Sequence, residues 1–207
     1  MRAPYVGQVA CGDPPVSVPV VRVFVPSTLV TLARAAVSGE LPVPGGTAFA
    51  VTPASVEMHT DGDVEELEML AAEAAAARSL CLLAAVPEPA AGPPVAGGPV
   101  AARRVVVAVD VPDTAVTVPA DWDEDSPDLV ELPGPVAMEA VASVLADPPS
   151  IAELVNRALP VAGEPPPQLG ALPEGPAWEA RDEVEASPLL WFDATEIEDL
   201  TRGVEAT

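Results

Sequence analysis

The chain has 207 residues and a formal net charge of -23 at pH 7, because 32 acidic side chains face nine arginines and no lysine. Without lysine, Schiff-base catalysis by lysine, the phosphate-binding loop GxxxxGK[ST] and the phosphate-pairing lysine of protein kinases are excluded. Since binding to nucleic acids and to anionic membranes depends on clustered basic side chains, the charge predicts that neither is a partner.

The first residues predict no regular element. Residues 1–19 contain several glycines and prolines that interrupt any period, and they are interpreted as a disordered stretch or an extension. Asp13, Pro14 and Pro15 stand where a signal peptide needs an unbroken apolar run. Since no apolar stretch reaches the roughly 20 residues of a membrane span either, a cytoplasmic location is predicted.

A strand, a helix and a second strand are predicted next. The β-branched run Val20–Val25 is typical of a strand, and the apolar spacing of residues 29–37 predicts a helix that the Ser-Thr pair before it can cap. Gly39 is positioned to end that helix. After a Pro/Gly turn, residues 47–52 have the composition of a second strand.

Two longer segments follow, separated by a loop. Residues 61–85 show the longest helical period of the chain, and Asp63 and Glu66 have the spacing of a reciprocal N-terminal cap. The Pro/Gly/Ala-rich stretch 86–102 is predicted to be a flexible loop. Val105–Val111 is nearly continuously apolar, which is typical of a strand buried on both faces.

The order β-α-β-α-β favours an α/β fold. We expect a central mixed, mostly parallel sheet of about four to five strands flanked by helices, with right-handed crossovers. A short strand is predicted over residues 129–132, and residues 141–145 fit either a strand or the end of a short helix from Val136. Ser150–Leu159 is predicted to be a helix capped by its first residue.

The predicted organisation is one domain with flexible parts and a docked C-terminus. Its parts are the extension 1–19, the α/β domain 20–160 with its loop 86–102, a proline-rich linker 161–181, a C-terminal helix within 182–200 that docks on the domain, and the tail 201–207. Trp191 and Phe192 form the densest aromatic spot of the chain. They are interpreted as an anchor for that helix, with a ligand platform as the alternative.

Several motifs occur in order along the chain. They are RVFVP at 22–26, AFAVTP at 48–53, GDVEELE at 62–68, RVVV and DVPD within 104–113, and LLWF at 189–192. Together, over about residues 20–200, they resemble an uncharacterised actinobacterial family, a domain of unknown function. The resemblance implies no activity and no catalytic residue.

Asp110 and Asp113 are the strongest candidate ligands in the sequence. They follow the predicted central strand, and open α/β sheets place their ligand crevice at the carboxyl ends of the strands. A carboxylate pair there can do acid/base work or hold Mg²⁺, and Arg22 or Arg104 nearby would lower its pKa. The alternative is turn chemistry, in which Asp113 caps the element that follows.

The other reactive side chains form no recognisable site. Cys11 and Cys81 lack CxxC spacing, and the acids within 61–68 fit a helix start better than a calcium loop. The acidic run 121–125 fits a solvated loop. His59, the single histidine, is interpreted as a loop residue in preference to a catalytic base. No metal and no cofactor is expected.

Two classes of function follow from the sequence. The first is a protein-binding or regulatory module with no assignable catalysis. The alternative is a carboxylate- or Mg²⁺-dependent enzyme with its site near Asp110 and Asp113. The first is favoured because no constellation of nucleophile, base and orienting group can be drawn.

Overall fold

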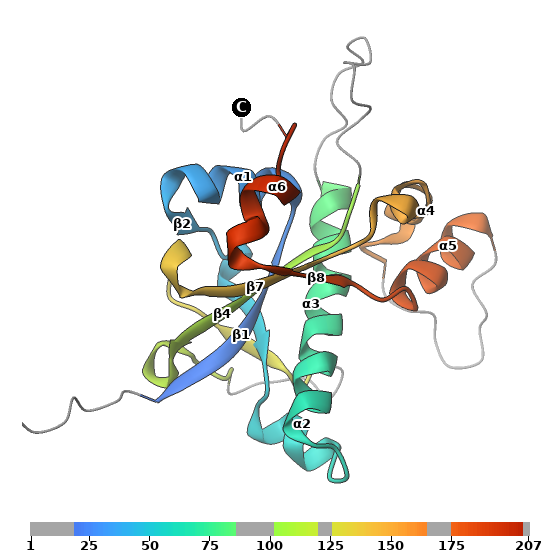
Figure 1. Cartoon of the computed structure of the whole chain (residues 1–207). Helices are drawn as coiled ribbons and strands as arrows, with labels where there is room; N and C mark the ends of the chain where they lie inside the picture. The colour runs from blue at the N-terminus through green and yellow to red at the C-terminus, as the bar shows by residue number, and fades with distance from the viewer. Residues whose placement is uncertain (1–18, 86–101, 120–125, 165–174, 205–207) are drawn as a thin grey trace, which may run out of the picture.

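The computed structural model describes residues 19–85, 102–119, 126–164 and 175–204, which form a sheet covered by helices (Figure 1). The strands are β1 (Val20–Ser27), β2 (Glu40–Leu41), β3 (Thr47–Ala50), β4 (Val105–Pro112), β5 (Leu129–Glu131), β6 (Val136–Ala137), β7 (Val141–Ala146) and β8 (Leu190–Asp193). The α-helices are α1 (Leu29–Ser38), α2 (Pro53–Met58), α3 (Val64–Ala85), α4 (Ala152–Ala158), α5 (Pro176–Glu185) and α6 (Ile197–Leu200). Short 3₁₀ turns are η1 (Pro44–Gly46), η2 (Asp113–Ala115), η3 (Met138–Ala140), η4 (Pro149–Ile151), η5 (Leu159–Val161) and η6 (Ala194–Glu196). In these ranges no helix is both long and apolar enough to cross a membrane.

Six strands form one sheet in the order β5-β3-β1-β4-β7-β8, and β2 pairs with β6 separately. Every neighbouring pair in the large sheet is antiparallel. The prediction of a mostly parallel sheet is therefore wrong. The prediction that Val105–Val111 forms a strand inside the sheet is confirmed, because β4 lies between β1 and β7.

The position of β1 explains why the sheet is antiparallel. β3 and β4 are both antiparallel to β1, so they run in the same direction, and α3 connects them as a parallel crossover would. β1 lies between them, which makes a split β-α-β unit. The connection from β1 to β3 consists of α1, β2 and η1. β3 starts near the end of β1 and pairs with it antiparallel, with Val23 opposite Ala50 and Phe24 opposite Phe49.

Helices cover both faces of the sheet (Figure 1). On one face, Leu32 of α1 and Ile197 of α6 pack with Val107 of β4 in the largest buried cluster. On the other face, alanines of α3 such as Ala75 pack on Phe24 and its neighbours. Because both faces are covered, residues 105–109 of β4 are all apolar and buried without being part of a parallel sheet.

Ser79 ties α3 to the centre of the sheet. Its hydroxyl donates to the Ser27 carbonyl at 2.7 Å and accepts from the Val105 amide at 2.9 Å, and the side chain is fully buried. This single hydroxyl therefore joins the end of β1, the start of β4 and α3.

The helices α4 and α5 form a smaller unit beside the end of α3. Leu80 of α3, Val155 of α4 and Val184 of α5 share a separate buried cluster. On α5 the guanidinium carbon of Arg181 lies 5.2 Å from the centroid of the Trp178 ring. This unit leads directly into β8.

Two helices begin and end as their sequences predict. The hydroxyl of Thr28 accepts from the Thr31 amide at 3.1 Å at the start of α1, and Gly39 ends that helix with a φ of 82°. At the start of α3, Glu66 donates its amide to Asp63 Oδ1 at 2.9 Å, and the Asp63 amide donates to Glu66 Oε2 at 3.2 Å. The predicted reciprocal cap is confirmed.

The C-terminal segment differs from the prediction. Residues 182–200 do not form one docked helix but hold the end of α5, the strand β8 and the short helix α6. Pro188 explains the break, because proline disfavours a helical residue before it. The predicted linker 161–181 likewise ends inside α5. Of the two alternatives for residues 141–145, the strand is confirmed as β7.

The helix predicted over Ser150–Leu159 is present as α4, with a different start. Ser150 lies in η4, and the N-cap residue of α4 is Ile151, which makes no side-chain cap. Several other predictions fall outside the described residues: those for 1–18, 86–101, 165–174 and 205–207, together with Cys11 and the acidic run 121–125.

Candidate functional site

Arg22 and Asp110 form an ion pair across neighbouring strands. The two residues are register partners on β1 and β4, with Nε 3.0 Å from Oδ1 and Nη2 3.1 Å from Oδ2. The hydrogen bond with Asp110 raises the pKa of Arg22, and partial burial opposes that rise. The side chains are 40% and 42% exposed, so the pair contributes about 0–1 kcal/mol. Arg22 and Asp110, two of the candidate site residues, are thus in contact across the two strands. Each side chain is bound to the other, so neither is left free for a ligand.

The structure does not bring the other two predicted site residues to this pair. Asp113 lies exposed in η2, and its amide donates to the Pro19 carbonyl at 3.1 Å. Arg104 precedes β4, at the opposite end of the strand from Asp110. Because neighbouring strands are antiparallel, their carboxyl ends lie at opposite edges, and the crevice of a parallel sheet does not form. Over the described ranges, no group of three or more His, Cys, Asp or Glu side chains can hold a metal ion.

Arg104 belongs instead to a buried ion pair with Asp147. Its Nη2 lies 2.8 Å from Asp147 Oδ1, its backbone amide donates to Oδ2 at 2.8 Å, and the side chains are 3% and 0% exposed. Arg104 Nη2 also donates to the Ser187 carbonyl at 2.9 Å. Arg103 donates to the Asp147 carbonyl, and burial lowers the pKa of Arg103 against the opposing charge of Asp147. We call these residues the arginine clamp; it joins β4, the end of β7 and the segment before β8.

A cavity of about 480 Å³ opens beside the arginine clamp. It lies between α3, the sheet and the segment that leads into β8, and we call it the edge groove. Its apolar lining includes Met69, Ala72, Ala76, Leu145, Pro188 and Leu189. The charged residues in the lining are Glu73, Glu185 and Arg104, and the last is already neutralised by Asp147.

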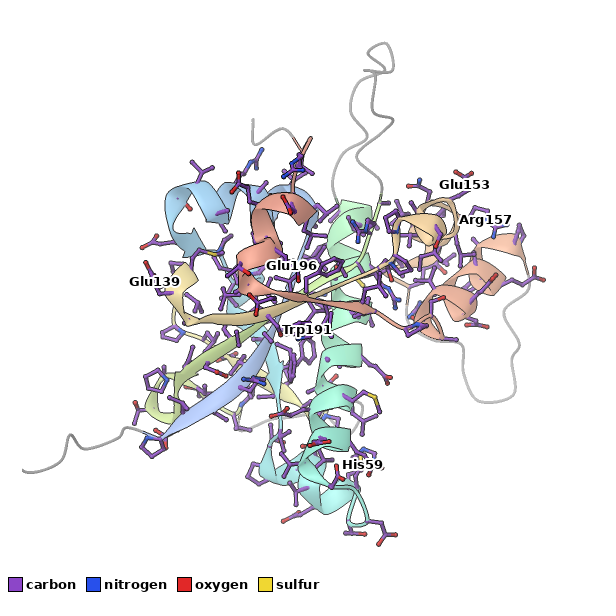
Figure 2. The ribbon with its side chains drawn as sticks, in the orientation of Figure 1. His59, Glu139, Glu153, Arg157, Trp191 and Glu196 are labelled. Atoms are coloured by element: carbon purple, nitrogen blue, oxygen red, sulfur yellow. The ribbon has the colours of Figure 1, made fainter. Side chains whose placement is uncertain are left out.

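Trp191 stands on β8 next to the edge groove and is 61% exposed (Figure 2). Its register partner is Leu145 on β7, which packs toward α3, so Trp191 lies on the same face as the groove. Successive strand residues point to opposite faces, and accordingly Phe192 packs into the core on the side of α1 and α6. The predicted anchor of a C-terminal helix is therefore not present: both residues lie on β8, where Phe192 is partly buried against the core and Trp191 faces solvent.

Acidic side chains flank β8 at both ends. Before the strand, α5 carries Glu179, Asp182, Glu183 and Glu185. Asp193 is the last residue of the strand, and Glu196, Glu198 and Asp199 follow it. The Thr195 amide and hydroxyl donate to Asp193 Oδ1 at 2.9 and 2.7 Å, and these bonds lower the pKa of Asp193. The end of β8 therefore carries negative charge at neutral pH.

A second polar cluster surrounds Asp128, near His59 at the far end of α3 from α4 (Figure 2). Asp128 is 6% exposed and its Oδ1 accepts no hydrogen bond. Burial raises the pKa of Asp128, while the nearby Ser55 hydroxyl and His59 oppose the rise. Ser55 is fully buried, and its hydroxyl donates to the Thr52 carbonyl at 3.0 Å. It is therefore a capping residue of α2 and not an accessible nucleophile.

Replacing Asp128 with asparagine is expected to stabilise the protein at neutral pH. The raised pKa means that the folded state holds the proton more tightly than the unfolded chain, so stability falls as the pH rises through the folded-state pKa. Removing the buried charge should therefore raise the free energy of unfolding at pH 7–8 by about 1–2 kcal/mol. Urea unfolding as a function of pH checks this, and the gain should fade below about pH 4, near the ordinary pKa of aspartate. A gain that grows with acidity would contradict the assignment.

Sequence reasoning missed two buried acids, Asp128 and Asp147. Each stands next to a proline, a pattern typical of exposed turns, and this hides their burial. The adjacent Arg103 and Arg104 before an apolar strand were the available signal, because a buried guanidinium requires an acidic or carbonyl partner.

A family model matches residues 21–201, and its description is a family of unknown function, DUF6912. The match covers most of the chain, so the chain belongs to this family, and the expected resemblance to an uncharacterised family is confirmed. No curated protein and no solved structure matches the chain.

Proposed function

Starting from membership in this family of unknown function, we propose that the chain is a cytoplasmic protein-binding module without a catalytic site of its own. Its binding surface is β8 together with the edge groove. The observation that carries the proposal is the exposure of Trp191, 61%, on the last strand of the sheet and beside an apolar cavity.

The chemistry of this surface supports a macromolecular partner. Trp is among the residues that contribute most to binding energy in protein interfaces. Leu190, on the other face of the same strand, is 45% exposed as well. Apolar side chains exposed on both faces of an edge strand, with acids near both of its ends, support an interaction site.

The lining of the edge groove does not favour catalysis. Most of the residues around the cavity are alanine, leucine, methionine and proline, and the charged group closest to the sheet, Arg104, is held by Asp147. A catalytic site needs a nucleophile or base in hydrogen-bond reach of a substrate and an orienting group behind it. The groove offers apolar area instead, which supports the binding function.

The substitution Trp191→Ala tests the proposal. We expect it to weaken the complex with a partner retained from native cytosol by at least about 30-fold in Kd, the effect of an interface residue worth about 2 kcal/mol. Stability should change little, because the side chain is mostly exposed. The measurement is quantitative retention on the tagged full-length chain, followed by a titration of the purified partner.

The matched control is Val37→Ala, an apolar truncation on α1 at a position that is 83% exposed and does not line the edge groove. It should retain the same partner with unchanged affinity. If no stoichiometric partner distinguishes the wild type from the Trp191→Ala variant, the proposed function is wrong.

A further inference from the structure

We propose that the partner binds as an added β-strand: an extended segment, apolar in its middle and basic at both ends, pairs with the outer edge of β8. This inference rests on the proposed function and specifies the partner that the edge groove takes.

The outer side of β8 is free to accept a strand. β8 is the last strand in the order of the sheet, and in the part of the chain that the structure describes nothing pairs with its second side. Edge strands are usually protected from such pairing by a lysine, a proline or an inward-pointing charge. Here the strand exposes Leu190 and Trp191, and the whole chain contains no lysine. Pro188 lies before the strand, and the one charged residue within the strand is Asp193, at its end.

The two faces of β8 specify an alternating apolar pattern in the added strand. A residue opposite Trp191 would point to the side of α3, over the groove that Met69 and Leu189 line. Its two neighbours would point to the other face, beside Leu190 and Phe192. Backbone hydrogen bonds would supply affinity, and the groove would supply the preference for an apolar side chain.

The charges around β8 specify the ends of the added strand. Acids on α5 lie at one end of β8 and the acids of η6 and α6 lie at the other. Two arginines near these acids are already paired, Arg181 with Glu185 at 2.8 Å and Arg202 with Asp199. An incoming strand would therefore meet negative charge at both of its ends, and basic residues there would be attracted.

The same charges argue against a second copy of this chain as the occupant. In an antiparallel pairing of two β8 strands, α5 of one copy would lie beside η6 and α6 of the other, so acids would meet acids. Each copy also carries a formal net charge of -23. Repulsion between like charges therefore selects a basic partner.

Synthetic peptides added to the full-length chain test this inference. The first peptide has the sequence Val-Thr-Leu-Thr-Val between paired arginines, the second replaces the arginines by glutamates, and the third keeps the arginines but carries N-methylated backbone amides in its middle. Binding is measured by Trp fluorescence and by two-dimensional NMR of the backbone amides. We expect the arginine peptide to bind at least about tenfold more tightly than each of the others, with an affinity that falls as salt rises.

The backbone amides of Leu190–Asp193 should shift on binding and gain protection from hydrogen exchange. The variant Leu190→Lys, which gives the edge its missing lysine, should weaken binding at least about tenfold. Its matched control, Val37→Lys, makes the same change of charge on exposed α1 and should leave binding unchanged.

Three results would overturn the inference. They are equal binding of the N-methylated peptide, absence of binding by the arginine peptide up to millimolar concentration, and a dimer of the peptide-free chain in sedimentation that Leu190→Lys dissociates. The proposed function survives any of these if Trp191→Ala still releases the native partner. It fails separately if that variant retains the partner.

Discussion

The substitution Asp147→Ala is expected to lower the free energy of unfolding by about 3–5 kcal/mol, the effect of breaking a buried ion pair from one side. Asp147 is fully buried and accepts hydrogen bonds from the amide, Nε and Nη2 of Arg104. Its removal leaves a buried guanidinium whose remaining contact is the Ser187 carbonyl. Thermal unfolding should show a midpoint lower by about 10 °C.

The matched control is Asp110→Ala, which removes the same side chain from an arginine pair on the surface. Because Arg22 and Asp110 are both partly exposed, that change should lower stability by no more than about 1 kcal/mol. Equal losses for the two variants would show that the arginine clamp is not a stabilising element. The clamp also holds Ser187 beside the edge groove, so Asp147→Ala should weaken partner binding along with stability.

The substitution Ser79→Ala is expected to lower the free energy of unfolding by about 2–3 kcal/mol, because it leaves two buried backbone groups without a partner. Those groups are the Ser27 carbonyl and the Val105 amide, both bonded by the one hydroxyl. The volume change is a single oxygen atom, so the loss reports hydrogen bonding and not a cavity. Chemical unfolding at pH 7 measures it.

Ser38→Ala serves as the control for Ser79→Ala. Ser38 is exposed at the end of α1, and its hydroxyl lies 3.2 Å from the carbonyl of the exposed Glu40. We expect its removal to change stability by less than about 0.5 kcal/mol. If Ser79→Ala behaves like Ser38→Ala, the joint between α3 and the two strands does not carry the stability assigned to it.

Local patterns in the sequence predicted several elements correctly. The helix α3 could be predicted because its apolar period is long and its capping pair, Asp63 and Glu66, has a specific spacing. The strand β4 could be predicted because seven consecutive residues from Val105 are almost all apolar. These signals depend on neighbours within a few positions, and such neighbours are fixed before any tertiary contact forms.

The direction of the strands could not be predicted from such local patterns. An apolar run shows that both faces of a strand are covered, and a helix on each face covers an antiparallel strand as well as a parallel one. The insertion of β1 between β3 and β4 depends on pairing between segments far apart in the chain, which the periodicity of each segment does not show. The short helix α2 was missed although Thr52 and Pro53 have the cap and first-turn residues of a helix start.

Only part of the proposed binding surface could be predicted from the sequence. Trp191 was recognisable as important from its rarity, but its assignment to a docked helix concealed its exposure. Leu189, Leu190 and Phe192 have spacings that suit a helix, and a strand of four residues is too short to show alternation against that pattern. Pro188 was the contrary signal.

The place of β1 at the centre of the sheet has a consequence for how the chain acquires its fold. β1 is the first of the described strands to be synthesised, yet it pairs with β4, from Ser27 with Val105 to Val20 with Pro112, about two fifths of the chain later. Until β4 leaves the ribosome, one whole edge of β1 lacks its neighbour. Pairing between strands that are far apart in the sequence is slow relative to helix formation. While β4 is still being synthesised, the unpaired edge of the valine-rich β1 can pair incorrectly or bind a chaperone.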